Sequence, residues 1–188
     1  MYRDNSLIPS EALRLLALGL LAQSPRRYGA LVAEVRDFVG HVVGPSLDLL
    51  GAPLEVLKVE GLVAPLASAA AESATENEDA QDPPLAVTET GLAEARRLLL
   101  ANVRPPANEI NKLIVAVKIR FLHLLPIEEQ RMQADMLAES CQREALRLTE
   151  LRGRLGNDDA TFLAWLDREI AAAKDRLAWF RALDEKLG

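Results

Sequence analysis

Two short stretches decide the fold: residues 54–63, Leu-Glu-Val-Leu-Lys-Val-Glu-Gly-Leu-Val, and residues 85–91, Leu-Ala-Val-Thr-Glu-Thr-Gly. In the first, the leucine spacing is helical and the helix ends at Gly61, since glycine commonly follows a last helical turn. An extended segment, 62–66, then begins, and residues 85–87 are suited to run back beside it. Thr88 is a typical N-cap for a following helix. The pattern predicts helix, two-stranded ribbon and helix, in that order.

Further helices are predicted upstream of the ribbon. Ser10 is a candidate N-cap, and a leucine-rich apolar face follows it up to about residue 21. A break at 23–25 separates this helix from one over 27–39, and a third helical pattern runs over 46–60 with Pro53 as a kink or restart. Three helices and a ribbon make a winged helix, so the fold class is mainly α with a small wing, and residues 1–104 form a winged helix-turn-helix domain.

A different region follows the prolines at 105 and 106. Apolar residues recur at spacings of three and four over 110–124, a helix of nearly 30 residues is predicted over 127–155, and another follows a break at 156–158. These long apolar seams exceed what one small core would bury, which predicts a helical homodimerisation domain over 105–188. Its expected contact residues are Leu113, Val117, Phe121, Leu137, Leu148, Leu151, Leu163, Leu166, Ile170, Leu177 and Phe180.

Composition excludes several classes of protein. The 188 residues are 49% hydrophobic and 27% charged but only 4% aromatic, which favours packed helices over a β-sandwich or barrel. The single cysteine, Cys141, cannot pair within the chain, and no signal peptide or membrane-spanning run is evident, so we expect a cytoplasmic protein without a membrane partner. The net charge of −6 gives no general attraction to nucleic acid.

The segments just described resemble the PadR family of bacterial transcriptional regulators. The likeness is carried by the leucine-rich opening at 12–21, the turn at 24–29, residues 54–63 with their Leu-x-x-Leu-x-x-Glu-Gly-Leu-Val pattern, and residues 87–91, Val-Thr-Glu-Thr-Gly. The C-terminal helices over 109–187, with a Leu-Pro-x-Glu-Glu break at 125–129, are similar as well. This resemblance implies a homodimer whose paired winged helices bind a double-stranded DNA operator. It also implies that a small aromatic or amphipathic effector could release the dimer from DNA, as it does in some relatives.

Five residues are candidates for DNA contacts because basic and polar groups near the helix starts reach phosphates and base edges in this class. They are Arg26, Arg27, Tyr28, Ser46 and Lys58. Ordinary surface or packing roles remain alternatives for Arg26, Arg27, Tyr28 and Lys58.

Local charge opposes this assignment. The expected recognition helix carries Asp48, Glu55 and Glu60 beside one lysine, and the acidic, flexible wing tip predicted at 67–84 holds five carboxylates and no base. Two functions therefore stay open: a dimeric DNA-binding regulator, and a winged-helix homodimer that binds a protein or ligand and has little affinity for DNA.

No catalytic or metal-binding pattern is present in the sequence. His41 and His123 are far apart without cysteine or carboxylate ligands at suitable spacing, and Cys141 lies on an apolar seam, so we expect no enzyme, metal or cofactor. Trp165 and Trp179 share a face of the last helix, where two copies could line a pocket for a flat apolar ligand; core packing is the alternative.

Overall fold

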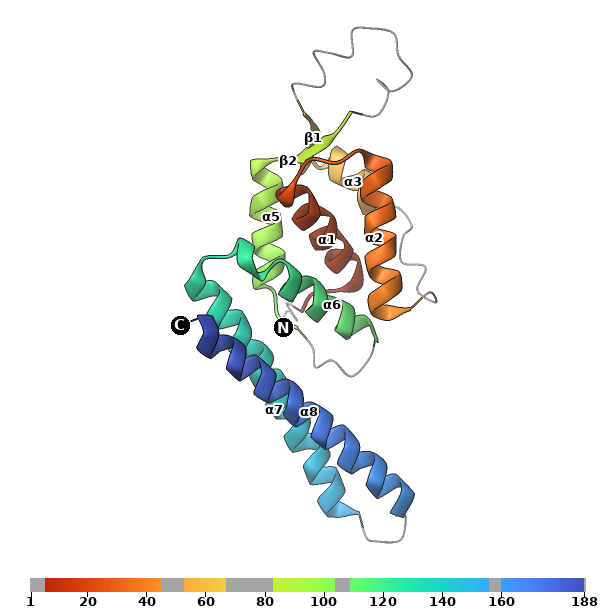
Figure 1. Cartoon of the computed structure of the whole chain (residues 1–188), viewed down its shortest axis with the longest axis vertical. Helices are drawn as coiled ribbons and strands as arrows, with labels where there is room; N and C mark the ends of the chain where they lie inside the picture. The colour runs from red at the N-terminus through yellow and green to blue at the C-terminus, as the bar shows by residue number, and fades with distance from the viewer. Residues whose placement is uncertain (1–5, 45–52, 67–82, 104–108, 156–159, 188) are drawn as a thin grey trace, which may run out of the picture.

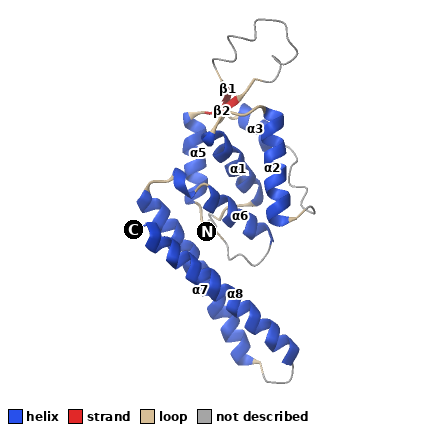
Figure 2. Cartoon of the chain, in the orientation of Figure 1, coloured by secondary structure: helices blue, strands red, loops and turns tan. Residues whose placement is uncertain are grey.

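The computed structural model describes residues 6–44, 53–66, 83–103, 109–155 and 160–187 (Figure 1). The first part of the chain holds α1 (Pro9–Gln23), α2 (Tyr28–Val43), α3 (Pro53–Val59), β1 (Val63–Pro65), β2 (Leu85–Val87) and α5 (Glu89–Leu100). It is followed by α6 (Glu109–Arg120), the short 3-10 helix η2 (Leu122–Leu124), α7 (Ile127–Arg154) and α8 (Ala160–Leu187). Helices dominate the chain, and the strands form one small sheet at the end of the molecule away from α7 and α8 (Figure 2).

The sheet is the wing predicted from the sequence. β1 and β2 pair antiparallel, with Val63 opposite Val87 and Pro65 opposite Leu85. The backbone of Arg26, between α1 and α2, adds a further bridge to Leu85 through hydrogen bonds of 3.0 and 2.7 Å. The winged-helix fold class is therefore confirmed.

Three residues shape the junction between α3, the wing and α5. Gly61 has φ +69°, a left-handed conformation that favours glycine. The Thr88 hydroxyl donates to the carbonyl of Gly61 and accepts a hydrogen bond from the backbone N–H of Gly91, so Thr88 caps α5 as expected. A Cβ on Gly91 would lie 2.1 Å from the Leu62 carbonyl oxygen, and this close approach requires glycine.

The core of the N-terminal domain surrounds α1, most of whose residues are buried on all sides. Helix α6 packs against α1 and α2, and a Cβ on Gly19 of α1 would lie 2.6 Å from the Phe121 ring. Figure 1 shows α6 crossing beside α1, although it follows the predicted domain boundary at residue 104. The first helix of the C-terminal half thus belongs by packing to the winged-helix core.

One lysine lies inside this core. Lys118 of α6 is only 1% exposed, and its Nζ donates a hydrogen bond to the carbonyl oxygen of Ala101, the residue that ends α5. Removal of the ammonium group from water lowers the pKa of Lys118 from 10.5 to about 7.

Helices α7 and α8 form an antiparallel hairpin that projects from the body of the molecule (Figure 1). Near the body, Leu137, Cys141 and Phe180 join the main hydrophobic core. Arg96 of α5 ties the first turn of α7 to the body, because its guanidinium binds the Glu129 carboxylate with Nε 3.1 Å from Oε2. The distal part of the hairpin has a small separate cluster of its own.

Several helix ends differ from the sequence prediction. Helix α1 begins at Pro9 rather than after Ser10, and the Glu11 carboxylate accepts the Ile8 N–H at 3.1 Å. Helix α2 continues to Val43 and ends at Gly44, where φ is +91°. The predicted wing tip, apart from residues 83 and 84, and the start of the third helical pattern lie outside the described residues.

Candidate nucleic-acid interface and apolar pocket

Arg26, a predicted DNA contact, is engaged inside the protein. Its Nη1 donates to the carbonyl oxygens of Leu20 and Ser24, at the end of α1, and its Nε lies 2.8 Å from Oε2 of Glu34. The side chain is only 18% exposed. Arg26 therefore adds a second donor to the Leu20 carbonyl, which already accepts the Ser24 N–H, and it also binds the Ser24 carbonyl. These contacts fix the turn into α2 and hold the Arg26 charge within the protein.

Arg27, Tyr28 and Lys58 lie together at the start of α2 and on α3. Arg27 is exposed and occupies the N-cap position of α2. The Lys58 ammonium lies 4.9 Å from the centre of the Tyr28 ring, a cation–π distance. Burial, with the Glu55 carboxylate nearby, raises the pKa of Tyr28, so its phenol is a neutral hydrogen-bond donor. We name Arg27, Tyr28 and Lys58 the basic cluster; the remaining candidate, Ser46, lies outside the described residues.

The acidic residues predicted near this surface are only partly free. Glu60 binds Arg14 of α1, with Oε2 2.8 Å from Nη1, so its charge is already neutralised. Glu55 remains exposed beside the basic cluster, and Asp48 lies outside the described residues. The described part of α3 thus presents one unpaired carboxylate next to one lysine, a weaker electrostatic objection to DNA than the sequence indicated.

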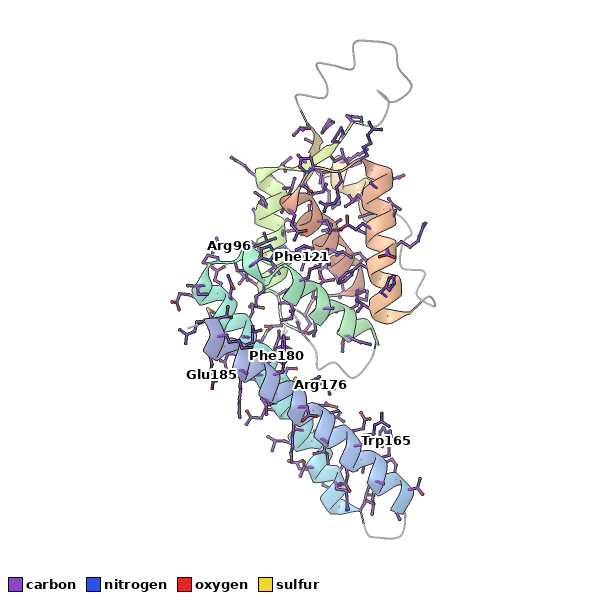
Figure 3. The ribbon with its side chains drawn as sticks, viewed as in Figure 1. Arg96, Phe121, Trp165, Arg176, Phe180 and Glu185 are labelled. Carbon is purple, nitrogen blue, oxygen red and sulfur yellow. The ribbon has the colours of Figure 1, made fainter. Side chains whose placement is uncertain are left out.

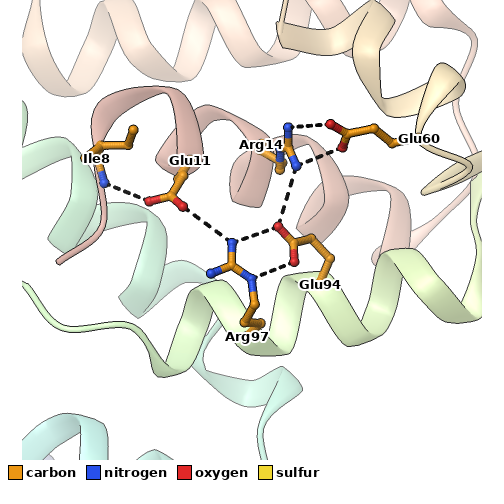
Figure 4. Close-up of polar contacts among 6 residues, drawn as sticks. All are labelled: Ile8, Glu11, Arg14, Glu60, Glu94 and Arg97. Atoms are coloured by element: carbon orange, nitrogen blue, oxygen red, sulfur yellow. Dashed lines mark hydrogen bonds and ion pairs between the residues drawn. The ribbon is translucent and has the colours of Figure 1, made fainter. Parts of the chain in front are cut away.

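Five charged residues connect the end of α3 to α1 and α5 (Figure 4). Arg14 also lies 3.6 Å from Glu94 of α5, and Arg97 binds Glu94 in a fork with distances of 2.7 and 2.9 Å. Arg97 reaches Glu11 at 3.4 Å as well. The hydrogen bonds from Arg97 lower the pKa of Glu94. This network fixes the exit from α3, and hence the wing, relative to the core.

The predicted dimer contacts fall into three groups. Leu113, Val117 and Phe121 are fully buried against α1 and α2 of the same chain, so they present no surface to a second copy. Leu151 is 39% exposed and Leu177 is partly buried. The rest are buried at the α7–α8 contact or where the hairpin meets the body: Leu137, Leu148, Leu163, Leu166, Ile170 and Phe180.

Helical periodicity identified these seams but could not tell an intrachain contact from an interchain one. Apart from Leu151, the apolar side chains that remain exposed on α7 and α8 were not predicted as dimer contacts, although Trp165 and Trp179 among them were predicted as pocket residues. They are Ile127, Met132, Leu146, Leu155, Phe162, Trp165 and Trp179, each at least 37% exposed.

The two tryptophans lie in different surroundings. Trp165, 50% exposed, stacks on Phe162 with ring centres 5.5 Å apart on the distal half of the hairpin. Trp179 packs edge-on against Phe180 at 5.0 Å, nearer the body. Figure 3 shows the separation along α8 between Trp165 and the Arg176–Phe180 region. Within one chain the tryptophans therefore do not line a common pocket.

A pocket of about 520 Å³ lies between α2, α6 and α8. Its walls are apolar and include the rings of Phe38, Trp179 and Phe180 together with aliphatic side chains of α2 and α6. The charged residues that line it are all basic: Lys112, Arg120 and Arg176. The sequence predicted a pocket lined by Trp165 and Trp179 of two copies, whereas this pocket lies within one chain and includes Trp179 but not Trp165. Its α2 and α6 residues could not be predicted, because only the folding of the chain brings them opposite α8.

Among the described residues, no group of three or more His, Cys, Asp or Glu side chains is arranged to hold a metal ion. None of the described helices combines the length and the apolar character required to span a membrane.

The fold and the basic cluster on it define a winged-helix protein with an α-helical C-terminal hairpin. Residues 2–184 match the family model described as "Putative AphA-like transcriptional regulator", and the chain belongs to this family of transcriptional regulators. Among solved structures, it is similar to PadR of Bacillus subtilis in complex with operator DNA, with 14% identity, a TM-score of 0.37, and coverage of 94% of this chain and 99% of that one. No curated protein matches the chain.

Proposed function

We propose that this protein binds double-stranded DNA as a homodimeric transcriptional regulator. The observation that carries the proposal is the basic cluster. Arg27 and Tyr28 lie at the start of α2, and Lys58 lies in the last turn of α3, over the Tyr28 ring. The cluster belongs to a winged helix in a chain of a regulator family. Exposed cations placed beside a helix start are suited to phosphates, and a phenol donor adds to them. The Arg14–Glu60 pair supports the same reading, because it withdraws a carboxylate that would repel DNA.

Dimerisation is proposed from the hairpin. Its distal half projects from the body, and Leu148, Leu166 and Ile170 form a small hydrophobic cluster there, separate from the main core. Leu151, Trp165 and their exposed apolar neighbours would be covered if a second hairpin packed alongside. A symmetric pair also places two winged helices on two half-sites of one operator.

Electrophoretic mobility shift with DNA from the protein's own promoter, repeated across salt concentrations, tests DNA binding. The salt slope of the binding constant falls by about 0.9 for each phosphate contact that is lost. Joint replacement of Arg27→Gln and Lys58→Gln should therefore weaken binding and make the slope shallower by up to about 3.6, for four contacts per dimer. Arg168→Gln, an exposed residue of α8, is the matched control and should change neither. An unaltered slope in the double variant would remove the basic cluster from the interface.

Light scattering tests the dimer. The protein should have twice the mass of one chain, and Leu151→Glu with Trp165→Glu should shift it towards the monomer, because both side chains are exposed within one chain. Leu92→Glu, equally apolar and exposed but on α5, is the control and should leave the mass unchanged. A wild-type monomer at micromolar concentration would contradict the proposal.

A second function is favoured by one specific observation. On α3, Val59 is 87% exposed and Val56 is 38% exposed, so the described part of the expected recognition helix is apolar as well as charged. An interaction module with little DNA affinity would use such a surface to bind a protein. Absence of any mobility shift at low salt would select this alternative.

A further inference from the structure

The pocket between α2, α6 and α8 opens to the surface, and its exposed walls are almost entirely apolar. The three basic residues that border it therefore contribute the hydrocarbon parts of their side chains rather than their charged ends. Phe38, Val115 and Trp179 are among the other lining residues, and Trp179 is 53% exposed. Such a surface favours an apolar occupant over a charged or hydroxylated one.

A pair of exposed aromatic rings lies near the other end of α8. Phe162 is 38% exposed and Trp165 is 50% exposed, and the two rings stack with their centres 5.5 Å apart. Trp165 lies two heptads before Trp179, about 21 Å along the helix, and Figure 3 shows this separation from the Arg176–Phe180 region. Each chain thus has an apolar pocket at one end of α8 and exposed rings at the other, too far apart to meet within the chain.

The spacing of these features along α8 is suited to a two-fold axis. Trp165, Ala172 and Trp179 recur every seven residues, so they lie on one face of the helix. If two copies of α8 run antiparallel and cross at Ala172, Trp165 of each copy lies opposite the partner's Trp179, and the same contact forms twice. The small side chain of Ala172 lets the two helices approach closely at the crossing.

We infer that the pocket is the docking site for a second copy of this chain, whose Phe162–Trp165 pair packs between α2, α6 and α8. The inference rests on the proposed homodimer and specifies how its hairpins pair. The pocket includes Phe38 and Val42 of α2, the helix whose start carries the basic cluster. The hairpin of one protomer therefore contacts the partner's α2 and holds the two winged helices at a fixed separation, which sets the spacing of the half-sites.

Tryptophan fluorescence of the Trp179→Phe variant tests the contact without DNA, because Trp165 is then the remaining tryptophan. In the dimer its emission should shift to shorter wavelength, and acrylamide should quench it more weakly, since the ring leaves water for an apolar pocket. Dilution to the monomer should reverse both changes. Light scattering on the same samples shows which state is present at each concentration.

A pair of substitutions locates the contact. Ala116 of α6 lines the pocket, so Ala116→Phe should fill it. Ala116→Phe and Trp165→Ala should each raise the dimer dissociation constant at least about 100-fold, which is about 10-fold for each of two symmetric contacts. The combined variant should dimerise better than the product of the two effects, because the smaller side chain leaves room for the added ring. Ala93→Phe, exposed on α5 and outside the pocket lining, is the control and should dimerise as the wild type does.

Three results would overturn the inference. In the first, light scattering shows a dimer whose Trp165 is as accessible as in the monomer. In the second, the effects of Ala116→Phe and Trp165→Ala simply multiply. In the third, the wild-type dimer binds the neutral dye Nile red and Ala116→Phe abolishes that binding, which would assign the pocket to a small apolar ligand. Each of these leaves the proposed homodimer standing with a different interface, whereas a wild-type monomer would contradict the homodimer itself.

Discussion

Replacement of Lys118→Met is expected to change how the stability of the fold depends on pH. Lys118 is buried in α6 with the Ala101 carbonyl as its hydrogen-bond partner, and burial lowers its pKa from 10.5 to about 7. Between these two values the unfolded chain binds a proton on this lysine that the folded chain does not bind. The free energy of unfolding must therefore rise with pH across this window, and the rise approaches 1.36 kcal/mol for each pH unit.

The magnitude follows from the two pKa values. Below about pH 7 the lysine is protonated in both states, and the folded protein carries the whole penalty, about 5 kcal/mol. From pH 7.5 to 9.5 the penalty decreases by about 2.5 kcal/mol. Methionine has a similar length and no charge, so the Lys118→Met variant should lack this increment. Loss of the hydrogen bond to Ala101 costs about 1 to 3 kcal/mol at every pH and does not alter the slope.

Urea unfolding followed by far-ultraviolet circular dichroism at pH 7.5, 8.5 and 9.5 measures the effect. Other titrating groups contribute equally to both proteins, so the difference between wild type and variant isolates Lys118. Lys174→Met, on an exposed position of α8, is the control and should run parallel to the wild type. Parallel curves for Lys118→Met would refute the reasoning, because they would mean that the buried lysine holds its proton equally in the folded and unfolded states.

Three further predictions concern the core and its ion pairs. Gly19→Ala should destabilise the protein by about 1 to 3 kcal/mol and lower its melting temperature, because the added Cβ would lie 2.6 Å from the Phe121 ring. A Phe121→Leu background should relieve the loss, and an unchanged melting temperature in Gly19→Ala alone would contradict the contact. Arg26→Gln should cost about 1 to 3 kcal/mol in urea unfolding, because the Leu20 carbonyl loses a charged donor; a variant as stable as the wild type would show that Arg26 is dispensable to the fold. Glu94→Gln should lower the free energy of unfolding by about 1 kcal/mol at pH 7, because the uncharged amide loses the ion pair with Arg97. Below the lowered pKa of Glu94 the wild-type carboxyl is protonated and also uncharged, so the two proteins should be equally stable, and a difference that persists at low pH would contradict this.

Local signals were sufficient for the winged helix. Thr88 caps α5, and Gly61 and Gly91 lie where the backbone demands glycine, so residue types with strong short-range preferences marked each element of this region correctly. The antiparallel pairing of 63–65 with 85–87 was also predicted from local signals. The first run follows Gly61 at the end of one helix, and the second precedes the Thr88 cap of the next, so two short apolar runs between helices were expected to pair as extended strands.

The candidate site was predicted less completely. Arg26 and Arg27 are adjacent and chemically identical in the sequence, yet Arg26 is partly buried against the end of α1 and Arg27 is exposed at the start of α2. The burial of Arg26 depends on carbonyls and a carboxylate from other turns of the chain, and no local pattern contains that information.

The amino-acid sequence by itself determined where helices, turns and the wing occur, since capping, glycine conformation and apolar spacing act over a few residues. Only the tertiary structure decided which partner each apolar face meets. Leu113, Val117 and Phe121 form as regular a seam as any on α7 or α8, but they are buried by α1 and α2, and Gly19 is what permits that approach. The physical reason is that burial of apolar surface is non-directional: periodicity shows that a face must be covered, while long-range packing selects the surface that covers it.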